Sequence, residues 1–453
     1  MSYDEAIAYL STLEWHGIKL GLQNMQTALE AFGNPQNDFH SILVAGTNGK
    51  GSTCAFLNQI LIENKHKTGF YSSPHLVKYN EHIRVNNKIP SNTEFGKLIL
   101  GIKAKLEQER LLLSHFEVLT LAALCWFCEK KVEFAVLEVG MGGRLDATNA
   151  VNTVANAVTN IGLDHQQHLG NSLREIAVEK AGILKNNAPL LSTEQKPEFQ
   201  QLFSDLASAK EAKSYFLNQD FFHENEQMRF PLQSMDFKGF GIEWKDLELS
   251  LFGRHQFDNA SLALAIASQL HAQRLIRLSE AKTRQALSKT EWPARFQTLQ
   301  QNPPVILDGC HNPDGAKVLA QALSDAFPDK KIVFVFGVSS DKNAQQMLST
   351  LLPMSSRAFF CEARFRKTPA ASLATIAKEF LPAFKIKEIV SVKEAVREAL
   401  KTAQPQEIIC ICGSLYVAGE ALELKWAAKP KKKKEAQKAP VTADLKIESS
   451  EMK

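Results

Sequence analysis

The segment 42–53, with the sequence ILVAGTNGKGST, joins an apolar β-branched run to three glycines and a lysine. The run predicts a strand, and the segment 54–64 that follows predicts a helix. A glycine turn between a strand and a helix directs backbone N–H groups and the positive end of the helix dipole at one point, where an anion binds. Lys50 would reach the outer phosphates of a nucleotide, and Ser52 or Thr53 would hold Mg²⁺.

The predicted phosphate loop comprises Gly46, Thr47, Asn48, Gly49, Lys50, Gly51, Ser52 and Thr53. An ordinary strand-to-helix turn is the alternative interpretation. That alternative gives no packing reason for a lysine placed directly between two glycines. We therefore expect a nucleotide phosphate at this loop.

Further polar clusters follow other predicted strands. The segments 71–76 (YSSPHL), 137–149 (LEVGMGGRLDATN) and 159–165 (TNIGLDH) each leave an apolar run. In an open parallel sheet, ligands bind beyond the carboxyl ends of the strands, where these clusters fall. Mg²⁺ prefers hard oxygen ligands, so Glu138 is a natural ligand at its strand end. A lone histidine such as His165 is more often a hydrogen-bonded structural residue.

Apolar patterning predicts the elements that position these clusters. Helices are expected at 3–13 and 22–32, and a first set of strands at 42–45, 68–72, 134–139, 154–161 and 189–192. After Trp292-Pro293 a second set is expected at 305–308, 331–336, 357–361, 385–390 and 407–412. Strands that alternate with helices indicate a parallel sheet covered on both faces. The segment 220–251 alternates as antiparallel strands do.

The predicted fold class is therefore α/β. An N-terminal domain carries the phosphate loop on a parallel sheet, and a C-terminal Rossmann-like α/β domain follows it. The second domain has no GxGxxG fingerprint, so it has no need to bind a dinucleotide.

Composition and charge argue against a membrane protein and against a nucleic-acid-binding protein. The chain has 453 residues and 44% hydrophobic residues, which is typical of a globular protein of two or three domains. No apolar run approaches the length of a membrane span and the first ten residues show no signal pattern, so a cytoplasmic protein without membrane contact is expected. The net charge of +4 equals that of the lysine-rich tail alone, so the body is neutral and no specific nucleic-acid partner is expected.

The seven cysteines show no spacing that links them into a framework. Cys125 and Cys128 lie in a helical apolar stretch, and Cys410 and Cys412 lie in a predicted strand. We interpret both pairs as small buried hydrophobic residues rather than zinc ligands or disulfides.

Several motifs occur in order along the chain: GIKLGL at 17–22, the phosphate loop, SSPHL at 72–76, FE at 116–117, GGRLDATN at 142–149, DH at 164–165, EKAG at 179–182, DGCHNP at 308–313 and GSLY at 413–416. The phosphate loop is shorter than the common GxxxxGK[ST] pattern and resembles the compact ATP loop of the Mur ligase superfamily. With its other motifs, the chain resembles the folylpolyglutamate synthase/dihydrofolate synthase family of that superfamily over about residues 3 to 420.

The resemblance implies roles for individual residues. Lys50 and the loop amides would hold the ATP phosphates, and Asn259, Arg295 and Asp308 would contact the nucleotide. The implied Mg²⁺ ligands are Ser52, Ser73, Glu138 and His165. Lys180 matches a lysine that the family carries as a carbamate formed with CO₂, which would turn a cation into an anion. An unmodified Lys180 in a surface helix is the alternative.

The family's pterin-side pocket corresponds to Lys19, Leu20, Gly21, Ser114, His115, Phe116, Glu117, Arg144 and Asp146. The incoming glutamate would be handled at Asp308, His311 and Ser414. These three residues, with Lys50 and Lys180, form the implied catalytic set.

Two positions depart from the family's pattern. Lys19 stands where some bifunctional members have an acidic residue. Ala294-Arg295 replaces the commoner Gly-Arg, which restricts the backbone and keeps the guanidinium. The resemblance therefore leaves open whether the chain makes dihydrofolate, extends tetrahydrofolates or does both.

The resemblance implies an ATP- and folate/pteroate-binding domain at 1–292 and a glutamate ligase domain at 293–427. The lysine-rich composition of residues 428–453 predicts a disordered tail. The implied reaction adds L-glutamate to tetrahydrofolate, and also to dihydropteroate, through an acyl phosphate, with release of ADP and phosphate. A monomer with small-molecule substrates is expected. The alternatives are a Mur-type ligase for a cell-wall precursor and a P-loop ATPase that switches a binding partner through the basic tail.

Overall fold

The computed structural model describes residues 2–14 and 21–426. The predicted tail at 428–453, together with Lys19 and Leu20, lies outside the described residues. None of the helices in the described part is long and apolar enough to cross a membrane.

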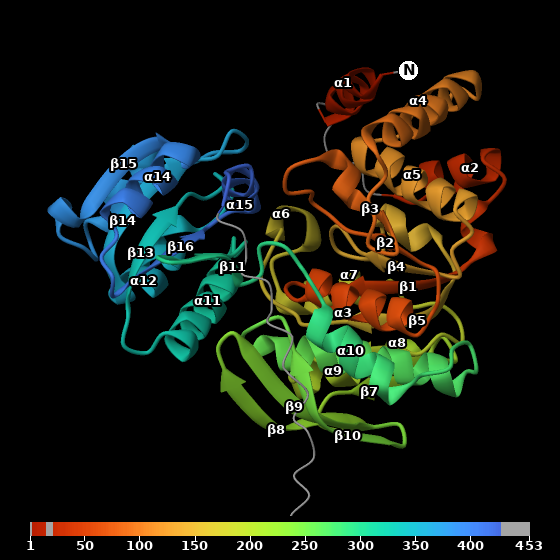
Figure 1. Ribbon diagram of the computed structural model, residues 1–453. Coiled ribbons are helices and arrows are strands. Elements are labelled where there is room, and N and C mark those ends of the chain that lie inside the picture. The colour runs from red at the N-terminus through yellow and green to blue at the C-terminus, as the bar shows by residue number, and fades with distance from the viewer. Residues whose placement is uncertain (1, 15–20, 427–453) are drawn as a thin grey trace, which may run out of the picture.

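A seven-stranded sheet forms the N-terminal part, in the order β3-β2-β4-β1-β5-β6-β7 (Figure 1). Its strands are β1 (His40–Ala45), β2 (Thr68–Tyr71), β3 (Ile83–Val85), β4 (Phe134–Glu138), β5 (Thr153–Val158), β6 (Leu190–Ser192) and β7 (Ser214–Phe216). All neighbours are parallel except β2 and β3. The five predicted strands are present, and β3 and β7 add a short strand at each edge.

The central strands are apolar on both faces because helices cover both. In β1, Leu43 and Ala45 pack into one core, whereas Ile42 and Val44 pack into the core on the opposite face. This alternation follows from the period of two along a strand. The first core includes residues of α1 (Tyr3–Glu14), α2 (Gln23–Ala31), α4 (Asn92–Gln108), α5 (His115–Glu129), α7 (Leu173–Ala181) and α8 (Pro197–Ser208).

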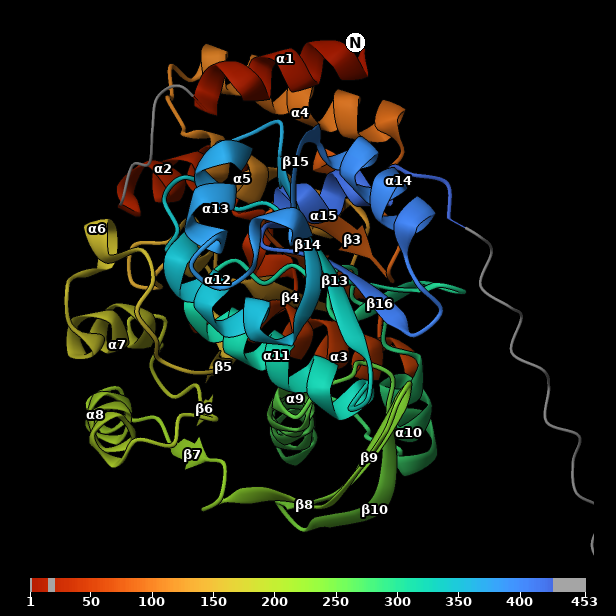
Figure 2. The ribbon, with the colours of Figure 1, turned by 90° about the vertical axis from the view of Figure 1, so that its left-hand side faces the viewer.

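The second core lies between β1 and a three-stranded antiparallel sheet. It includes residues of α3 (Lys50–Glu63), α9 (His255–Ala272) and α10 (Glu280–Lys289). The small sheet consists of β8 (Phe221–Arg229), β9 (Leu232–Gly239) and β10 (Ile242–Leu249), and it lies at the end of the molecule opposite α1 in both ribbon views (Figures 1 and 2). The antiparallel prediction for residues 220–251 is thus confirmed.

A six-stranded sheet forms the C-terminal part, in the order β11-β12-β16-β13-β14-β15. Its strands are β11 (Gln297–Gln301), β12 (Pro304–Leu307), β13 (Lys331–Phe336), β14 (Ser355–Glu362), β15 (Ile386–Ser391) and β16 (Glu407–Cys412). Helices α11 (Pro313–Ala326), α12 (Ala344–Leu351), α13 (Ala370–Ala377), α14 (Val392–Thr402) and α15 (Leu415–Leu422) cover it. Figure 2 shows this part in front of the seven-stranded sheet.

Only β11 was not predicted in this part, and it runs antiparallel to β12. Both sheets are therefore mixed rather than wholly parallel, each with one antiparallel edge strand. The predicted domain boundary after residue 292 falls between α10 and β11 and stays a prediction.

Short elements complete the chain. They are α6 (Gln166–Leu169), η1 (Pro35–Asp38), η2 (Tyr79–His82), η3 (Ala147–Ala150), η4 (Leu352–Met354) and η5 (Ala383–Lys385).

All seven cysteines are free. Cys410 and Cys412 are buried, as predicted. Cys125 and Cys128 are only half-buried, and the Cys128 thiol donates to the Asp38 carboxylate at 2.9 Å. The purely hydrophobic interpretation of Cys128 is therefore wrong, because its polar neighbour comes from η1 (Pro35–Asp38), which is distant in sequence.

Candidate active site

The glycine loop (residues 46–53) leaves β1 and enters α3, which begins at Lys50 and so earlier than predicted. Gly46 has a φ of +144°, and a Cβ added there would lie 1.8 Å from Thr159 Oγ1. Gly49 has a φ of +87°, and a Cβ there would lie 2.4 Å from Asn259 Oδ1. Both glycines are therefore required by backbone conformation and by close approach.

Residues that follow β5 hold this loop in place. The Thr159 hydroxyl donates to the carbonyl of Asn48 at 2.6 Å, and the Asn48 N–H donates to Asn160 Oδ1 at 2.9 Å. The N–H of Gly162 donates to the Thr47 hydroxyl at 2.9 Å. The ends of β1 and β5 thus form one rigid assembly, which is the location expected for a ligand site in a parallel sheet.

Two lysines converge on the same carbonyl of the glycine loop. Lys50 Nζ donates to the Gly46 carbonyl at 3.0 Å and to that of Thr47 at 3.2 Å, and Lys180 Nζ donates to the Gly46 carbonyl at 2.8 Å. Lys180 is only 4% exposed, so the surface-helix alternative is wrong. Burial, reinforced by the charge of Lys50, lowers the pKa of Lys180 to about 7.

Glu138, at the end of β4, is buried and accepts a hydrogen bond from the backbone N–H of Ser73. Burial raises the pKa of its carboxyl, while Lys50 and Arg295 oppose the shift. Glu138 forms no ion pair within the described residues. A buried carboxylate in this setting favours a cation beside it.

His165 lies just before α6 with a φ of +51°, and its Nε2 is 3.9 Å from Asp164 Oδ2. Desolvation lowers the pKa of the imidazole, and Asp164 opposes the shift. The charges of Lys50 and Lys180 also act on His165. Ser52, by contrast, is buried at the start of α3, where its hydroxyl lies 3.4 Å from Gln256 Nε2.

Asn259 lies beneath the glycine loop on α9. Its Nδ2 donates to Gln256 Oε1 at 3.0 Å, and its Oδ1 lies 3.5 Å from the Thr53 hydroxyl. The side chain is buried and braces the loop at Gly49. Asn259 therefore supports the loop from below, and its contact with a nucleotide stays a prediction.

The C-terminal part brings Asp308 to the end of β12. The Asp308 carboxylate accepts from the backbone N–H groups of Phe296, at 2.8 Å, and Cys310, at 2.9 Å. Burial raises the pKa of this carboxyl, and the charge of Arg295 opposes the shift. Arg295 stands between Ala294 and Phe296, both of which have a positive φ. This tight turn directs the guanidinium at the Gly309 backbone.

His311 and Ser414 follow β12 and β16. His311 Nδ1 lies 3.1 Å from the Gly309 carbonyl, so Nδ1 carries the proton and Nε2 is left as an acceptor. Burial lowers the pKa of His311 to about 4. Ser414 caps α15, where its hydroxyl accepts from the N–H of Tyr416 at 3.1 Å.

Contacts between the two parts of the chain lie beside these residues. Asn312 Nδ2 donates to Asn48 Oδ1 at 3.1 Å, which joins the α11 cap to the glycine loop. Lys342 Nζ lies 2.7 Å from Asp164 Oδ1. The sequence analysis included Asn312 in the motif DGCHNP without assigning it a role, and it did not single out Lys342. Both follow predicted strands of the second sheet, so the strand-end rule could have identified them.

Several of the predicted pterin-side residues make hydrogen bonds within the protein. Ser114 and Glu117 form the capping box of α5, in which Glu117 Oε2 accepts from the Ser114 N–H at 2.7 Å. Asp146 is buried and accepts from the N–H groups of Met141 and Thr148, at 2.9 and 3.0 Å, and burial raises its pKa.

Phe116 and Asp146 both lie beside Gly140: a Cβ added at this glycine would meet both side chains. The ring of His115 lies 5.6 Å from that of Tyr79. Arg144 forms an ion pair with Glu179 at 2.8 Å, while Gly21 has a φ of +150°. Glu117 and Asp146 thus have structural hydrogen bonds, and their substrate contacts stay predictions.

Comparisons with known proteins agree with this arrangement. The Mur ligase middle domain matches residues 44–267, and the Mur ligase glutamate ligase domain matches residues 294–415. A "Dihydrofolate synthase/folylpolyglutamate synthase" of Bacillus subtilis is 34% identical over 92% of this chain and 97% of its own length.

Solved structures match over the same length. Folylpolyglutamate synthase of Mycobacterium tuberculosis complexed with ADP has a TM-score of 0.84 and 29% identity, covering 92% of this chain and 98% of its own. "E.coli FolC in complex with DHPP and ADP" has a TM-score of 0.82 and 29% identity, covering 92% and 97%. The chain belongs to the Mur ligase family, in its branch of dihydrofolate and folylpolyglutamate synthases.

Proposed function

We propose that the chain is an ATP-dependent ligase that joins L-glutamate to tetrahydrofolate and to dihydropteroate. The observation that carries this proposal is the convergence of Lys50, Lys180 and Asn312 on the glycine loop. Residues from the N-terminal and C-terminal parts of the chain thus surround one phosphate-binding turn, as a reaction that joins two substrates requires. The relatives named above act in folate metabolism, which supports the substrate class.

The reaction requires activation of a carboxylate. An oxygen of the folate or pteroate carboxylate attacks the γ-phosphorus of ATP, the bond to ADP breaks, and an acyl phosphate forms. The neutral amine of glutamate then attacks the acyl carbon, the bond to phosphate breaks, the nitrogen loses a proton, and an amide remains. Lys50 and the loop N–H groups stabilise the charge on the transferring phosphoryl group.

Mg²⁺ fits the oxygen-rich part of this site. Glu138 is a buried carboxylate with no ion pair in the described part of the chain, and Ser73 adjoins it. With Ser52 and His165, these residues would hold the ion. When bound, Mg²⁺ supplies charge neutralisation for the ATP phosphates.

The residues of the C-terminal part orient glutamate. His311 is neutral at physiological pH because burial lowers its pKa to about 4, so its Nε2 accepts a hydrogen bond from the glutamate amino group. Asp308 and Ser414 lie at the neighbouring strand ends. Positioning and electrostatics carry most of the catalysis.

Lys180 is suited to carbamate formation. Because the pKa of Lys180 is about 7, about half of the protein molecules carry it as a neutral amine at neutral pH. The neutral amine attacks CO₂, the nitrogen loses a proton, and a carbamate anion forms. A ¹³C NMR carbamate signal after incubation with ¹³CO₂, absent in Lys180→Met, is the expected result.

The direct test measures Mg²⁺-dependent ADP release with glutamate plus either tetrahydrofolate or dihydropteroate, with products identified by mass. A glutamate-sized gain on both acids supports the full proposal. A gain on tetrahydrofolate alone limits it to polyglutamate synthesis. Turnover that requires a uridine-nucleotide precursor, or ATP hydrolysis without an acid and an amine, contradicts it.

A further inference from the structure

A second charged feature lies away from the glycine loop, where α3 and α9 end and α10 begins. These three helices pack side by side beneath the seven-stranded sheet (Figure 1). Between their ends is a hollow of about 840 Å³. The basic residues that line it are Lys65, His66, His271, Arg274, Arg277 and Lys282. We refer to this cavity as the basic hollow.

No carboxylate lines the basic hollow. Lys65, Arg274, Arg277 and Lys282 form no side-chain hydrogen bond or ion pair within the part of the chain that the structure describes. Lys65, Arg274 and Arg277 are exposed, and Lys282 is half-buried. Four like charges that face one cavity without partners repel one another, and a bound anion would relieve that repulsion.

The local architecture holds these groups together. The Ser279 N–H donates to Asn64 Oδ1 at 2.9 Å, and Asn64 Nδ2 lies 3.4 Å from the Thr283 hydroxyl. The start of α10 is thereby fixed against the end of α3. His66 Nδ1 pairs with Glu133 at 2.9 Å, and His271 Nδ1 bonds to the Ile276 carbonyl at 3.1 Å.

Helix stability explains only two of the four cations. Lys65 and Arg274 each follow the C-cap residue of α3 or α9, with φ of +77° and +61°, and a cation there complements the helix dipole. The chain uses Arg110 and Lys131 in the same way after α4 and α5. Lys282 instead lies in the first turn of α10, where the dipole disfavours a cation, and Arg277 lies in a loop.

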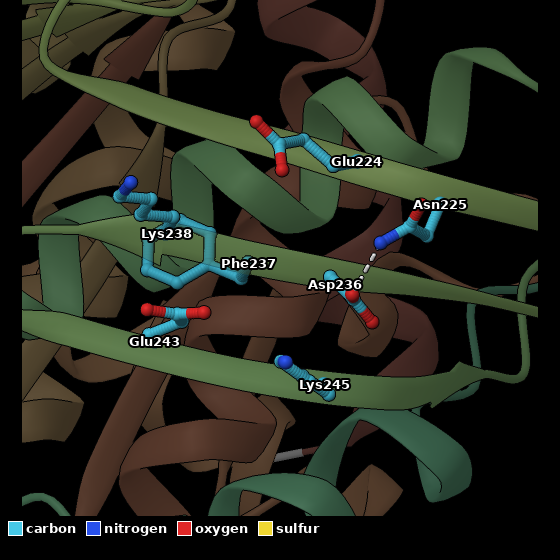
Figure 3. A pocket seen from close by; sticks show the side chains of 7 residues that line it. All are labelled: Glu224, Asn225, Asp236, Phe237, Lys238, Glu243 and Lys245. Atoms are coloured by element: carbon cyan, nitrogen blue, oxygen red, sulfur yellow. Dashed lines mark hydrogen bonds between the residues drawn. The ribbon is translucent and has the colours of Figure 1, made fainter.

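A second hollow, over the three-stranded sheet, gives a contrast (Figure 3). It measures about 160 Å³ and combines the carboxylates of Glu224, Asp236 and Glu243 with two lysines. Asn225 Nδ2 donates to Asp236 there at 2.7 Å. Such mixed charges compensate one another, which is the ordinary state of a solvated surface. In the basic hollow, by contrast, His66 is the one lining group with a carboxylate partner within the described residues, Glu133.

We propose that the basic hollow binds a small anion with two or more phosphate or carboxylate groups. Arginine and lysine together suit such groups, because the guanidinium bonds in a planar fork while the ammonium acts as a point charge. The Ser279 side chain makes no capping hydrogen bond at the start of α10, so the N–H groups of the first turn add to the attraction. The site is distinct from the glycine loop, which lies at the opposite end of α3.

The test uses calorimetric titration of the full chain with inorganic tripolyphosphate and, separately, with a tri-γ-glutamate peptide. Lys50→Met serves as the background because it removes phosphate binding at the glycine loop. In that background we expect one site, with an affinity that falls about tenfold or more in K65G/R274G. Glycine suits the positive φ at both positions, so this variant is expected to fold normally.

The matched control is R110G/K131G, which removes two cations from the same backbone conformation outside the basic hollow. It should leave the affinity unchanged. Binding of tripolyphosphate alone identifies a phosphate compound, and binding of the peptide alone identifies a polycarboxylate. Equal weakening in both double variants, or binding of neither anion, overturns the proposal.

Discussion

Lys342 and Asp164 join the two parts of the chain through an ion pair of 2.7 Å, with side chains that are 12% and 14% exposed. Burial would raise the pKa of Asp164, but His165 and Lys342 hold it below its usual range. The pair fixes the loop after β5, which also braces the glycine loop through Thr47 and Gly162. Contact between the N-terminal and C-terminal parts of the chain is therefore coupled to the geometry of the phosphate-binding turn.

Removal of this pair tests that coupling. In Lys342→Met, the Asp164 carboxylate loses its partner in a mostly buried position, so we expect ADP release to fall at least about tenfold, with a stability loss of about 1–3 kcal/mol. Lys317→Met is the control, because its pair with Asp314 is 60% and 54% exposed and should contribute less than about 0.5 kcal/mol. Unchanged turnover in Lys342→Met would contradict the coupling.

Gly46→Ala tests the close approach at the glycine loop. The new Cβ would overlap Thr159 Oγ1 at 1.8 Å, so the loop must move and nucleotide binding should fall about a hundredfold or more. Isothermal titration with ADP measures this. Gly101→Ala is the control, because that glycine lies in α4 with open space around it, and it should gain about 0.5–1 kcal/mol of stability with binding unchanged.

Lys180 should give stability a distinct pH dependence. Its pKa is about 7 when folded and near 10.5 when unfolded, so the unfolded chain binds more protons between these values. The free energy of unfolding should therefore rise with pH by about 1.4 kcal/mol per unit in that window, relative to Lys180→Met. Urea unfolding at pH 7, 8 and 9 measures the difference. Parallel curves for the two proteins would show that Lys180 titrates normally, or that its carbamate is already present.

Ala294 tests the turn that presents Arg295. The residue is fully buried with a φ of +57°, a conformation that costs about 1 kcal/mol for alanine. In Ala294→Gly, relief of that cost offsets the loss of about 0.8 kcal/mol for one buried methyl, so stability should change little. Ala294→Val adds a β-branched side chain and should lose about 2 kcal/mol or more, with weaker ADP binding. A destabilised glycine variant together with a normal valine variant would refute this account.

Much of the fold could be predicted because it depends on local pattern. The strands at 42–45 and 134–139 are apolar runs, and such runs occur where both faces of a sheet are covered. The edge strands β3 and β7 were missed because each has only three residues, and β11 was missed because its sequence, QTLQQ, is mostly polar. Pairing with a neighbour, rather than an apolar run of its own, defines each of them.

The sequence by itself determined the glycine loop, because a lysine between glycines at the end of a strand is suited to binding phosphate. It also determined the order of motifs that marks the family. Only the tertiary structure decided that Lys180 is buried against Gly46, that Asn312 meets Asn48, and that four cations converge on one hollow. These contacts join residues more than a hundred positions apart, or depend on how neighbouring helices end. Only the packed arrangement of the elements sets such distances.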